Sequence, residues 1–287
     1  MARKERGGSM LTVVRKVVLL VCTGIILLPV AYTIMNVFMS TDEIMRYYSG
    51  IWKENGTYAV FHIFPDHWSL ESLYEVLLAS PDYLRKFWNS IGLAGAVVIG
   101  QLVISILAGY GFSKFCFPGH NVLFVLVVII MMMPYQVTLV SNYIMLDQMG
   151  LTGSYAAVIL PGIFSSFGVF LMKQIIDGIP QEIFEAARLD GAGQIYVLAE
   201  IVLPLAKGGM AALLILSFVD NWNMVEQPLV FLKEERMYPL SVFLAQSFSS
   251  SGGVIFACGL LAMLPVMLLY LYFQEELIEG ISVSGIR

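Results

Sequence analysis

The chain has 287 residues, of which 58% are hydrophobic and 13% are charged, and its formal net charge is −5. Soluble domains carry about 45–50% apolar and about 25% charged residues. So few charges cannot cover a soluble surface of this size, so we expect an integral membrane protein. The small negative charge also argues against nucleic acid as a partner.

Six apolar runs have the length of membrane spans, since a helix needs about 20 apolar residues to cross the hydrocarbon core. The fifth run is long enough only if it includes Asp220. We therefore predict an all-α protein with six transmembrane helices, forming one six-span domain (17–287) after an N-terminal tail (1–16). The predicted spans are 17–39, 89–112, 121–143, 151–172, 208–225 and 254–273, and the prolines inside them (Pro29, Pro134, Pro161 and Pro265) are interpreted as kinks.

Lysine and arginine residues predict the orientation, because cytoplasmic segments carry an excess of them. With a cytoplasmic N-terminus, ten of these residues lie inside and six lie outside. The inside residues are Arg3, Lys4, Arg6, Arg15, Lys16, Lys114, Lys173, Arg188, Lys207 and Arg287. The outside residues are Arg46, Lys53, Arg85, Lys86, Lys233 and Arg236. Both termini and the loop 177–206 are then cytoplasmic, while 40–88, 144–150 and 226–253 are outside.

The outer loop 40–88 has two readings. The stretch "SLESLYEVLLASPDYLRKFW" (69–88) has apolar and aromatic positions near helical spacing. This pattern favours a helix along the outer membrane interface, where Trp and Tyr gather. A solvated connector explains the stretch nearly as well. No role is assigned to residues 41–63.

Motifs of enzymatic chemistry are absent from the sequence. It has no G-x-x-x-x-G-K-[ST] phosphate loop and no G-x-S-x-G nucleophile motif. The three histidines, His62, His67 and His120, form no H-E-x-x-H pattern, so no metal site is predicted. We therefore predict no catalytic residue, no metal ligand and no cofactor bound by this chain.

The stretch "EIFEAARLDGAGQIYVLAEIVLPLAKGG" (182–209) is too charged to span a membrane. Pro180 and Glu182 suit the start of a short helix, and Gly191 suits its end. The small side chains of Ala186 and Ala187 leave a shallow patch that a foreign surface can approach. A helix lying on the head groups predicts a basic polar face instead. Here four acidic residues outnumber Arg188, which favours a helix that docks another protein.

The same stretch resembles the EAA loop in the permease subunits of bacterial ATP-binding-cassette importers. The family pattern is E-A-A, three residues, G, nine residues, I-x-L-P, and all seven fixed positions are present at this spacing. They are Glu185, Ala186, Ala187, Gly191, Ile201, Leu203 and Pro204. The stretches 85–100, 107–119, 217–232 and the closing "LIEGISVSGIR" are similar to the carbohydrate-uptake, maltose-permease-like branch, so the resemblance covers about residue 65 to the end.

The resemblance implies a subunit of an importer rather than an enzyme. Such permeases sit in the bacterial inner membrane beside a second permease subunit, often a different chain. Two ATPase subunits bind ATP and Mg²⁺, and an extracellular solute-binding protein delivers a sugar or oligosaccharide. The EAA helix docks on the ATPase and couples its closure to the spans. Here that helix lies between the fourth and fifth spans, and its ATPase-coupling residues are Glu185, Ala186, Ala187, Asp190 and Gly191.

Asp220, Asn221 and Asn223 flank Trp222 in the fifth predicted span. Ionisable groups inside a membrane are costly and suggest function. Carboxylates and amides beside an aromatic face suit sugar hydroxyls, so these three residues are candidates for the substrate pathway. The other interpretation, slightly favoured, is that they tie helices together or cap a helix end.

Three further hypotheses remain open at this point. The solute of the importer could be a phosphorylated sugar or polyol. The chain could be a stand-alone proton-coupled secondary transporter that uses Asp220, although no inverted repeat is visible. It could also be a membrane scaffold that docks a cytoplasmic enzyme without transporting anything. The sequence names neither the solute, nor the residues that contact it, nor the partner subunits.

Overall fold

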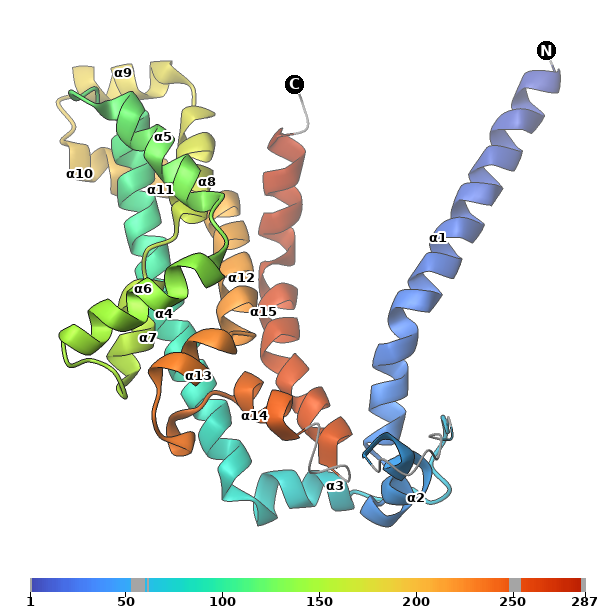
Figure 1. The fold of residues 1–287 in the computed structure, drawn as a ribbon. Coiled ribbons are helices and arrows are strands. Elements are labelled where there is room, and N and C mark those ends of the chain that lie inside the picture. Colours follow the sequence, from blue (N-terminus) through green and yellow to red (C-terminus); the bar gives the residue numbers. More distant parts are fainter. Residues whose placement is uncertain (1, 53–59, 61, 248–253, 285–287) are drawn as a thin grey trace. The chain divides into compact units, whose positions relative to one another are not determined.

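The computed structural model describes residues 2–52, 60, 62–247 and 254–284, and within these residues all regular structure is helical. The predicted all-α class is therefore confirmed. The chain divides into two compact units, residues 1–83 with 246–261, and residues 84–245 with 262–287. Figure 1 shows the order of the helices along the chain. Each unit is described by itself.

The first unit begins with one long helix and ends in short ones. Helix α1 (Ala2–Asn36) contains Pro29 and is followed by α2 (Thr41–Trp52), α3 (Glu71–Tyr74) and the π-helical turn η1 (Glu75–Ala79). A small core of Met39, Ile44 and Tyr48 joins the end of α1 to α2 and to Phe256. Because α1 is helical from Ala2 on, the predicted tail 1–16 continues into the first span without a break; the side of the membrane on which it lies remains a prediction.

The second unit holds most of the helices. They are α4 (Pro81–Lys114, whose first turn belongs to the first unit), α5 (His120–Met131), α6 (Tyr135–Gln148), α7 (Tyr155–Gly162), α8 (Ser166–Asp177), α9 (Gln181–Leu189), α10 (Gln194–Tyr196), η2 (Val197–Val202), α11 (Leu203–Leu205), α12 (Lys207–Trp222), α13 (Glu226–Phe231), η3 (Glu235–Met237), α14 (Leu240–Ser247, whose residues 246–247 belong to the first unit) and α15 (Ile255–Ser284, whose residues 255–261 belong to the first unit). Helix α8 packs against both α5 and α12.

Within the part of the chain that the structure describes, four segments are long and apolar enough to cross a membrane, and the count rises to six if two bent pairs are each one span. The four are Thr12–Asn36, Pro81–Lys114, Tyr155–Asp177 and Ile255–Glu276. The bent pairs are His120–Met131 with Tyr135–Gln148, and Gln194–Leu205 with Lys207–Trp222. A multi-pass protein is thus confirmed, whereas the count of six stays a prediction. Arg287, which defines the predicted cytoplasmic C-terminus, lies outside the described residues.

The third predicted span differs most from its expectation. A single kinked helix is expected across 121–143, but α5 and α6 meet at an angle of 103°. Proline lacks an amide hydrogen and disfavours helical geometry in the residue before it. Pro134 accordingly stands at the N-cap of α6 with φ −59° and ψ 135°, which places it outside both helices. The chain therefore turns sharply at Met132–Pro134 instead of bending gently.

Glycines allow the helices of the second unit to approach closely, as the sequence pattern predicts. A Cβ atom on Gly109 of α4 would lie 2.7 Å from the Cβ of Met172 and 2.9 Å from the backbone nitrogen of Lys173, both on α8. One on Gly100 would lie 2.5 Å from Ile163. Gly92, Gly95 and Gly111 have open space where a Cβ would stand, so close packing explains only some of the glycines of α4.

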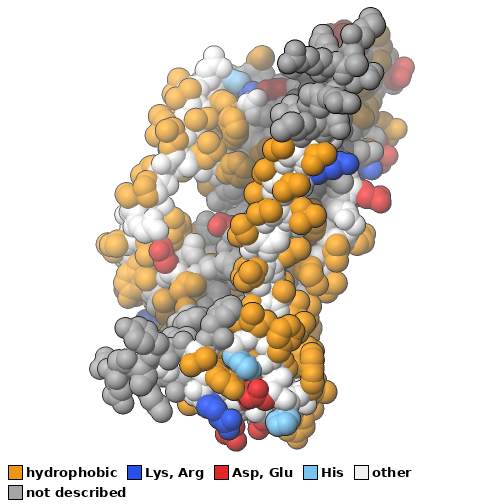
Figure 2. Space-filling view, turned by 90° about the vertical axis from the view of Figure 1, so that its right-hand side faces the viewer, with side chains coloured by type: hydrophobic (Ala, Val, Ile, Leu, Met, Phe, Trp, Pro, Cys, Tyr) orange, Lys and Arg blue, Asp and Glu red, His pale blue; other side chains and the backbone are white. Residues whose placement is uncertain are grey.

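Much of the surface is apolar, as a bilayer or partner subunits require. Figure 2 shows a face on which hydrophobic side chains prevail. In the predicted outer loop, Trp68, Tyr74 and Trp88 are exposed, while Tyr83 is buried and donates a hydrogen bond to the carbonyl oxygen of Cys258. The stretch 69–88 is largely helical, so the helical half of its prediction is confirmed.

Candidate coupling site and solute pathway

Helix α9 forms where the sequence predicts a short docking helix. Pro180 occupies its N-cap and Glu182 lies in its first turn, where a carboxylate stabilises the positive end of the helix dipole. At the other end, the amide of Ala192 donates to the carbonyl of Ala187 and the amide of Gly191 donates to that of Arg188. These two bonds define a Schellman cap, whose turning residue has a positive φ. Gly191 supplies it, with φ +78°.

One face of α9 is buried inside the second unit. Phe184 and Ala187 belong to a core with residues of α4, α8, η2 and α12, including Tyr110, Met172, Val202 and Leu213. Ala187 is only 7% exposed. This corrects the expectation that Ala186 and Ala187 share an open patch for a partner. Ala187 is small because the chain's own core lies against it.

The opposite face of α9 is open. Glu185, Ala186 and Asp190 are exposed, and so is Leu189, with 89% of its surface free. Ile195 and Tyr196 on α10 are exposed as well, at 84% and 60%. Sequence reasoning missed Leu189, Ile195 and Tyr196, although apolar residues within an otherwise acidic segment were a readable signal. We call Glu185, Ala186, Leu189, Asp190, Ile195 and Tyr196 the docking face.

Side-chain contacts fix the loop to the end of α4. The ammonium group of Lys114 lies 3.8 Å from the ring centre of Phe184, within the range of a cation–π interaction. The hydroxyl of Tyr110 donates to the Oε1 atom of Gln194 over 2.8 Å. These two contacts join α9 and α10 to the last turns of the long apolar helix α4.

Asp177, at the end of α8, makes a second attachment. Its Oδ1 atom accepts a hydrogen bond from Ser113 over 2.6 Å, and its Oδ2 atom lies 2.5 Å from the ammonium group of Lys173. Lys173 also lies over the ring of Phe124 on α5. The loop 177–206 is therefore fixed where it leaves α8 as well as along α9.

The three polar residues of the fifth predicted span do not share one face. Asn221 is half-buried, and its amide donates to the Ser217 carbonyl over 2.8 Å and lies 3.4 Å from the Oε1 atom of Gln101. Asp220 and Asn223 are exposed. The Asn223 amide donates to the carbonyl of Val219, one turn back, as expected of a residue at a helix end. This geometry supports the helix-tie interpretation for Asn221 and the helix-end interpretation for Asn223.

A small cavity of about 30 Å³ lies beside Asn221. Its lining residues are Tyr135, Val158, Pro161, Gly162, Asn221, Met224 and Gln227. Gln101, which borders it through Asn221, donates to the Gly162 carbonyl over 2.7 Å at the break between α7 and α8. The sequence analysis did not identify Gln101 as a candidate, although a single amide side chain within an apolar span could have indicated it. Hydroxyl and amide groups thus face a shared space next to a broken span.

Comparison with known proteins gives a consistent result. A family model described as "Binding-protein-dependent transport system inner membrane component" matches residues 101–282. The arabinooligosaccharides transport system permease protein AraQ of Halalkalibacterium halodurans is 29% identical over 262 residues, covering 90% of each chain. AraQ of Bacillus subtilis is 33% identical over 208 residues, covering 71% of this chain and 74% of that one. The sn-glycerol-3-phosphate transport system permease protein UgpE of Brucella abortus is 26% identical over 276 residues, covering 92% and 94%.

A solved structure shares the fold. A chain in the crystal structure of a bacterial ABC transporter involved in the import of the acidic polysaccharide alginate aligns with a TM-score of 0.77 at 20% identity. The alignment covers 94% of this chain and 97% of that chain. A second crystal structure, of the alginate transporter with a periplasmic protein bound to alginate pentasaccharide, aligns with a TM-score of 0.57.

Proposed function

We propose that this chain, which belongs to the family of binding-protein-dependent transport system inner membrane components, is the permease subunit of an ATP-driven importer of sugars or oligosaccharides. The observation that carries the proposal is the two-sided helix α9. Its buried face packs with α4, α8 and α12, while its docking face is exposed. A helix of this kind can transmit force from an external partner to the spans.

The energy for transport comes from a partner in this proposal. The sequence contains no phosphate-binding loop, so ATP and Mg²⁺ are assigned to two ATPase subunits. The docking face carries Glu185 and Asp190 around exposed Leu189 and Ile195. An apolar centre with a charged rim is the usual anatomy of a protein interface. Gly191 shapes the turn between the two helices, and Ala187 holds α9 against the spans.

The solute class is proposed from the relatives and from the polar groups around the cavity at Asn221, which at about 30 Å³ has room for a water molecule and not for a sugar. Its polar groups are the hydroxyl of Tyr135 and the amides of Asn221 and Gln227. Neutral donors and acceptors of this kind suit sugar hydroxyls, and the arabinooligosaccharide permeases among the relatives agree with this class. Asp220 and Asn223 are assigned to the pathway only as flanking residues. Both are exposed and lie apart from this group of contacts.

A phosphorylated polyol is the second candidate, since sn-glycerol-3-phosphate permeases are also among the relatives. A phosphate dianion is normally held by Arg or Lys side chains or by a helix N-terminus. Of the described residues that line the cavity, none is basic. The neighbouring Glu226, held by the amide of Gln136, adds negative charge instead. A neutral sugar is therefore preferred.

The remaining partners and the orientation belong to the same proposal. The chain would pair with a second permease subunit, receive solute from an extracellular binding protein, and keep both termini and the loop 177–206 in the cytoplasm of a bacterial cell. The orientation can be tested with single cysteines in a chain that lacks its native ones. His67→Cys and Glu235→Cys should react with an impermeant thiol reagent in whole cells, whereas Gln181→Cys should react only after lysis. Labelling of Gln181→Cys in intact cells would place the docking face outside and end the proposal.

The function is tested by uptake in vesicles that contain the complete importer. Labelled arabino-oligosaccharide should enter only with ATP and binding protein present, and labelled glycerol 3-phosphate should not compete. Leu189→Gln should lose the co-purified ATPase and the uptake together. Leu229→Gln, the same change at an exposed leucine of the predicted outer loop 226–253, should keep both.

A stand-alone transporter predicts a different result. This chain alone, in vesicles with an imposed proton gradient, would then accumulate sugar without ATP. That outcome would favour proton coupling through Asp220 and overturn the importer assignment. A chain that binds the ATPase yet never supports uptake with any partner set would instead be a scaffold.

A further inference from the structure

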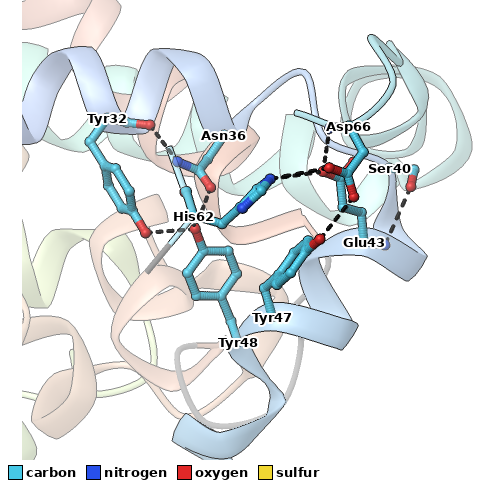
Figure 3. Close-up of polar contacts among 8 residues, drawn as sticks. All are labelled: Tyr32, Asn36, Ser40, Glu43, Tyr47, Tyr48, His62 and Asp66. Atoms are coloured by element: carbon cyan, nitrogen blue, oxygen red, sulfur yellow. Dashed lines mark hydrogen bonds and ion pairs between the residues drawn. The ribbon is translucent and has the colours of Figure 1, made fainter. Parts of the chain in front are cut away.

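Three titratable side chains meet in the segment to which the sequence assigns no role. Glu43 lies on α2, and His62 and Asp66 follow the residues that the structure leaves undescribed. Figure 3 shows the imidazole of His62 pointing toward the two carboxylates. The Nε2 atom of His62 lies 3.4 Å from Oδ1 of Asp66 and 3.9 Å from Oε1 of Glu43. One ligand atom from each residue lies within 4.8 Å of the other two.

These separations suit a shared ion. Bonds of about 2.0–2.1 Å to a tetrahedral ion place neighbouring ligand atoms about 3.3 Å apart. The contact between His62 and Asp66 is close to this value, and the contact between His62 and Glu43 is within a small side-chain adjustment of it. Within the described part of the chain, the Nε2 atom of His62 has no hydrogen-bond partner, although it is buried. An imidazole nitrogen with free coordination capacity therefore faces two acids.

Glu43 gives a second and independent indication. Its side chain is only 5% exposed, and a glutamate is rarely buried this deeply unless it is paired. Its Oε1 atom accepts a hydrogen bond from the amide of Asp66 over 2.6 Å, but its Oε2 atom has no partner among the described residues. A buried carboxylate oxygen without a partner is costly, and a bound cation would remove that cost.

The surrounding contacts hold the three ligands in place. The hydroxyl of Tyr47 donates to Oδ2 of Asp66 over 2.9 Å, and the ring of Tyr47 stacks on His62 with centres 4.2 Å apart. The amide of Glu43 donates to the hydroxyl of Ser40. Supporting contacts of this kind are typical of metal sites, where they orient the ligands.

We infer that Glu43, His62 and Asp66 form a binding site for a divalent transition-metal ion such as Zn²⁺. One imidazole and two carboxylates suit Zn²⁺ better than Mg²⁺ or Ca²⁺, which prefer oxygen ligands alone. Three protein ligands leave a fourth position for water or for the second oxygen of Glu43. The ion neutralises the two acids and ties α2 to residues 62–66 across the intervening chain. This inference does not depend on the proposed transport function.

The linear sequence predicts no metal site, because the ligands follow no short motif. Glu43 and His62 are separated by 18 residues, and only the folded chain brings them together. The competing explanation is that a protonated His62 holds the two carboxylates by charge alone. The two explanations differ in their response to added metal, and the following experiment separates them.

The full chain, purified with its partner subunits in detergent and stripped with a chelator, is titrated with Zn²⁺ against a chromogenic zinc indicator. Wild type should bind one more zinc ion per chain than His62→Gln or Glu43→Gln. His67→Gln is the matched control, because His67 is an exposed histidine of the same segment and lies outside the cluster. It should bind as wild type does. Tyr47→Phe should weaken binding about tenfold, as the loss of a ligand-orienting hydrogen bond typically does.

A ligand exchange guards against variants that fail to fold. In His62→Cys with Co²⁺ as the probe, a coordinating thiolate should add a charge-transfer absorption band in the near ultraviolet that wild type lacks. The inference is overturned if wild type binds no more Zn²⁺ than His62→Gln, or if His62→Cys gives no such band. Equal losses in His67→Gln and His62→Gln would also overturn it, since binding would then not reside in this cluster.

Discussion

The loop around α9 (177–206) and the predicted outer segment around α2 (within 40–88) both contain short helices between long apolar helices, yet they are stabilised differently. The loop is held by an apolar core that it shares with α4, α8 and α12. Among its described residues, the segment around α2 has a small core of Met39, Ile44 and Tyr48, and polar contacts from Tyr48, Glu43 and Asp66 connect its parts. An apolar core tolerates no change of volume, whereas a polar network tolerates no loss of a partner.

Replacing Ala187 by tryptophan should give the largest effect. The side chain is 7% exposed within the core, so a bulky ring cannot be accommodated, and overpacking costs about 1–3 kcal/mol or more. We expect uptake to be lost and the amount of chain in the membrane to fall, as measured by immunoblot of membrane fractions. Normal membrane levels of this variant would mean that α9 does not share a core with the spans.

Ala186→Trp separates the two faces of α9, because Ala186 is the exposed neighbour. We expect normal membrane levels but a loss of bound ATPase, since a central interface contact is worth about 2 kcal/mol, or roughly thirtyfold in affinity. The measurement is ATPase recovered per chain in a detergent pull-down, with uptake alongside. If this variant and Ala187→Trp behave alike, the distinction between the faces is wrong.

Tyr48→Phe tests the polar network of the outer segment. The Tyr48 hydroxyl lies 2.7 Å from Oδ1 of Asn36, 2.7 Å from the carbonyl oxygen of His62 and 2.6 Å from the Tyr32 hydroxyl. Removing it leaves fully buried Asn36 without this partner, at a cost of about 1–3 kcal/mol. Thermal unfolding in detergent should show lower stability, while Tyr74→Phe, at an exposed tyrosine, should match wild type.

Gly191→Ala tests the Schellman cap with a closely matched control. Gly191 has φ +78° and open space where a Cβ would stand, so strain from the backbone alone is expected, at about 1–2 kcal/mol. Gly193, two residues on, has φ −70° and equally open space. Gly193→Ala should therefore leave stability and uptake unchanged. If both variants lost stability and uptake equally, strain in the Schellman cap would not be the cause.

Asp220→Asn should have the smallest effect. Asp220 is exposed and stands apart from the contacts that Asn221 makes, so we expect at most a few-fold change in the apparent affinity for solute. Uptake is measured as a function of sugar concentration at several pH values. A complete loss of uptake would mean that Asp220 is a central residue of the solute pathway.

The comparison also explains what the sequence could predict. The helix α9 and its cap were predicted because one helix and one turn fix the spacing of Glu185 and Gly191, so the pattern is local. The burial of Ala187 was not predicted, since it depends on residues of α4 and α12 that are distant in the chain. The sharp turn at Pro134 was predicted only as a kink, because proline also occurs within helices, as Pro29 and Pro265 show here.

The outer segment shows the limit of such patterns more clearly. His62 and Glu43 look unrelated in the sequence, and the conformation of α2 decides that they meet. The same holds for Gln101 and Asn221, which lie on α4 and α12. Polar contacts between distant elements produce no local pattern in the sequence, whereas apolar runs and helix caps do.

The approach of α4 to α8 at Gly109 has a consequence for how this chain can evolve. A Cβ there would meet the backbone nitrogen of Lys173, which no choice of rotamer can move aside. At Gly209, by contrast, the obstacle is the end of the Ile175 side chain, which a neighbouring mutation could shorten. Gly209 can therefore be replaced in two ordinary substitutions, of which one shortens Ile175. Gly109 can be replaced only after α8 itself has shifted. Evolution can thus replace Gly209, whereas the close backbone contact keeps glycine at position 109.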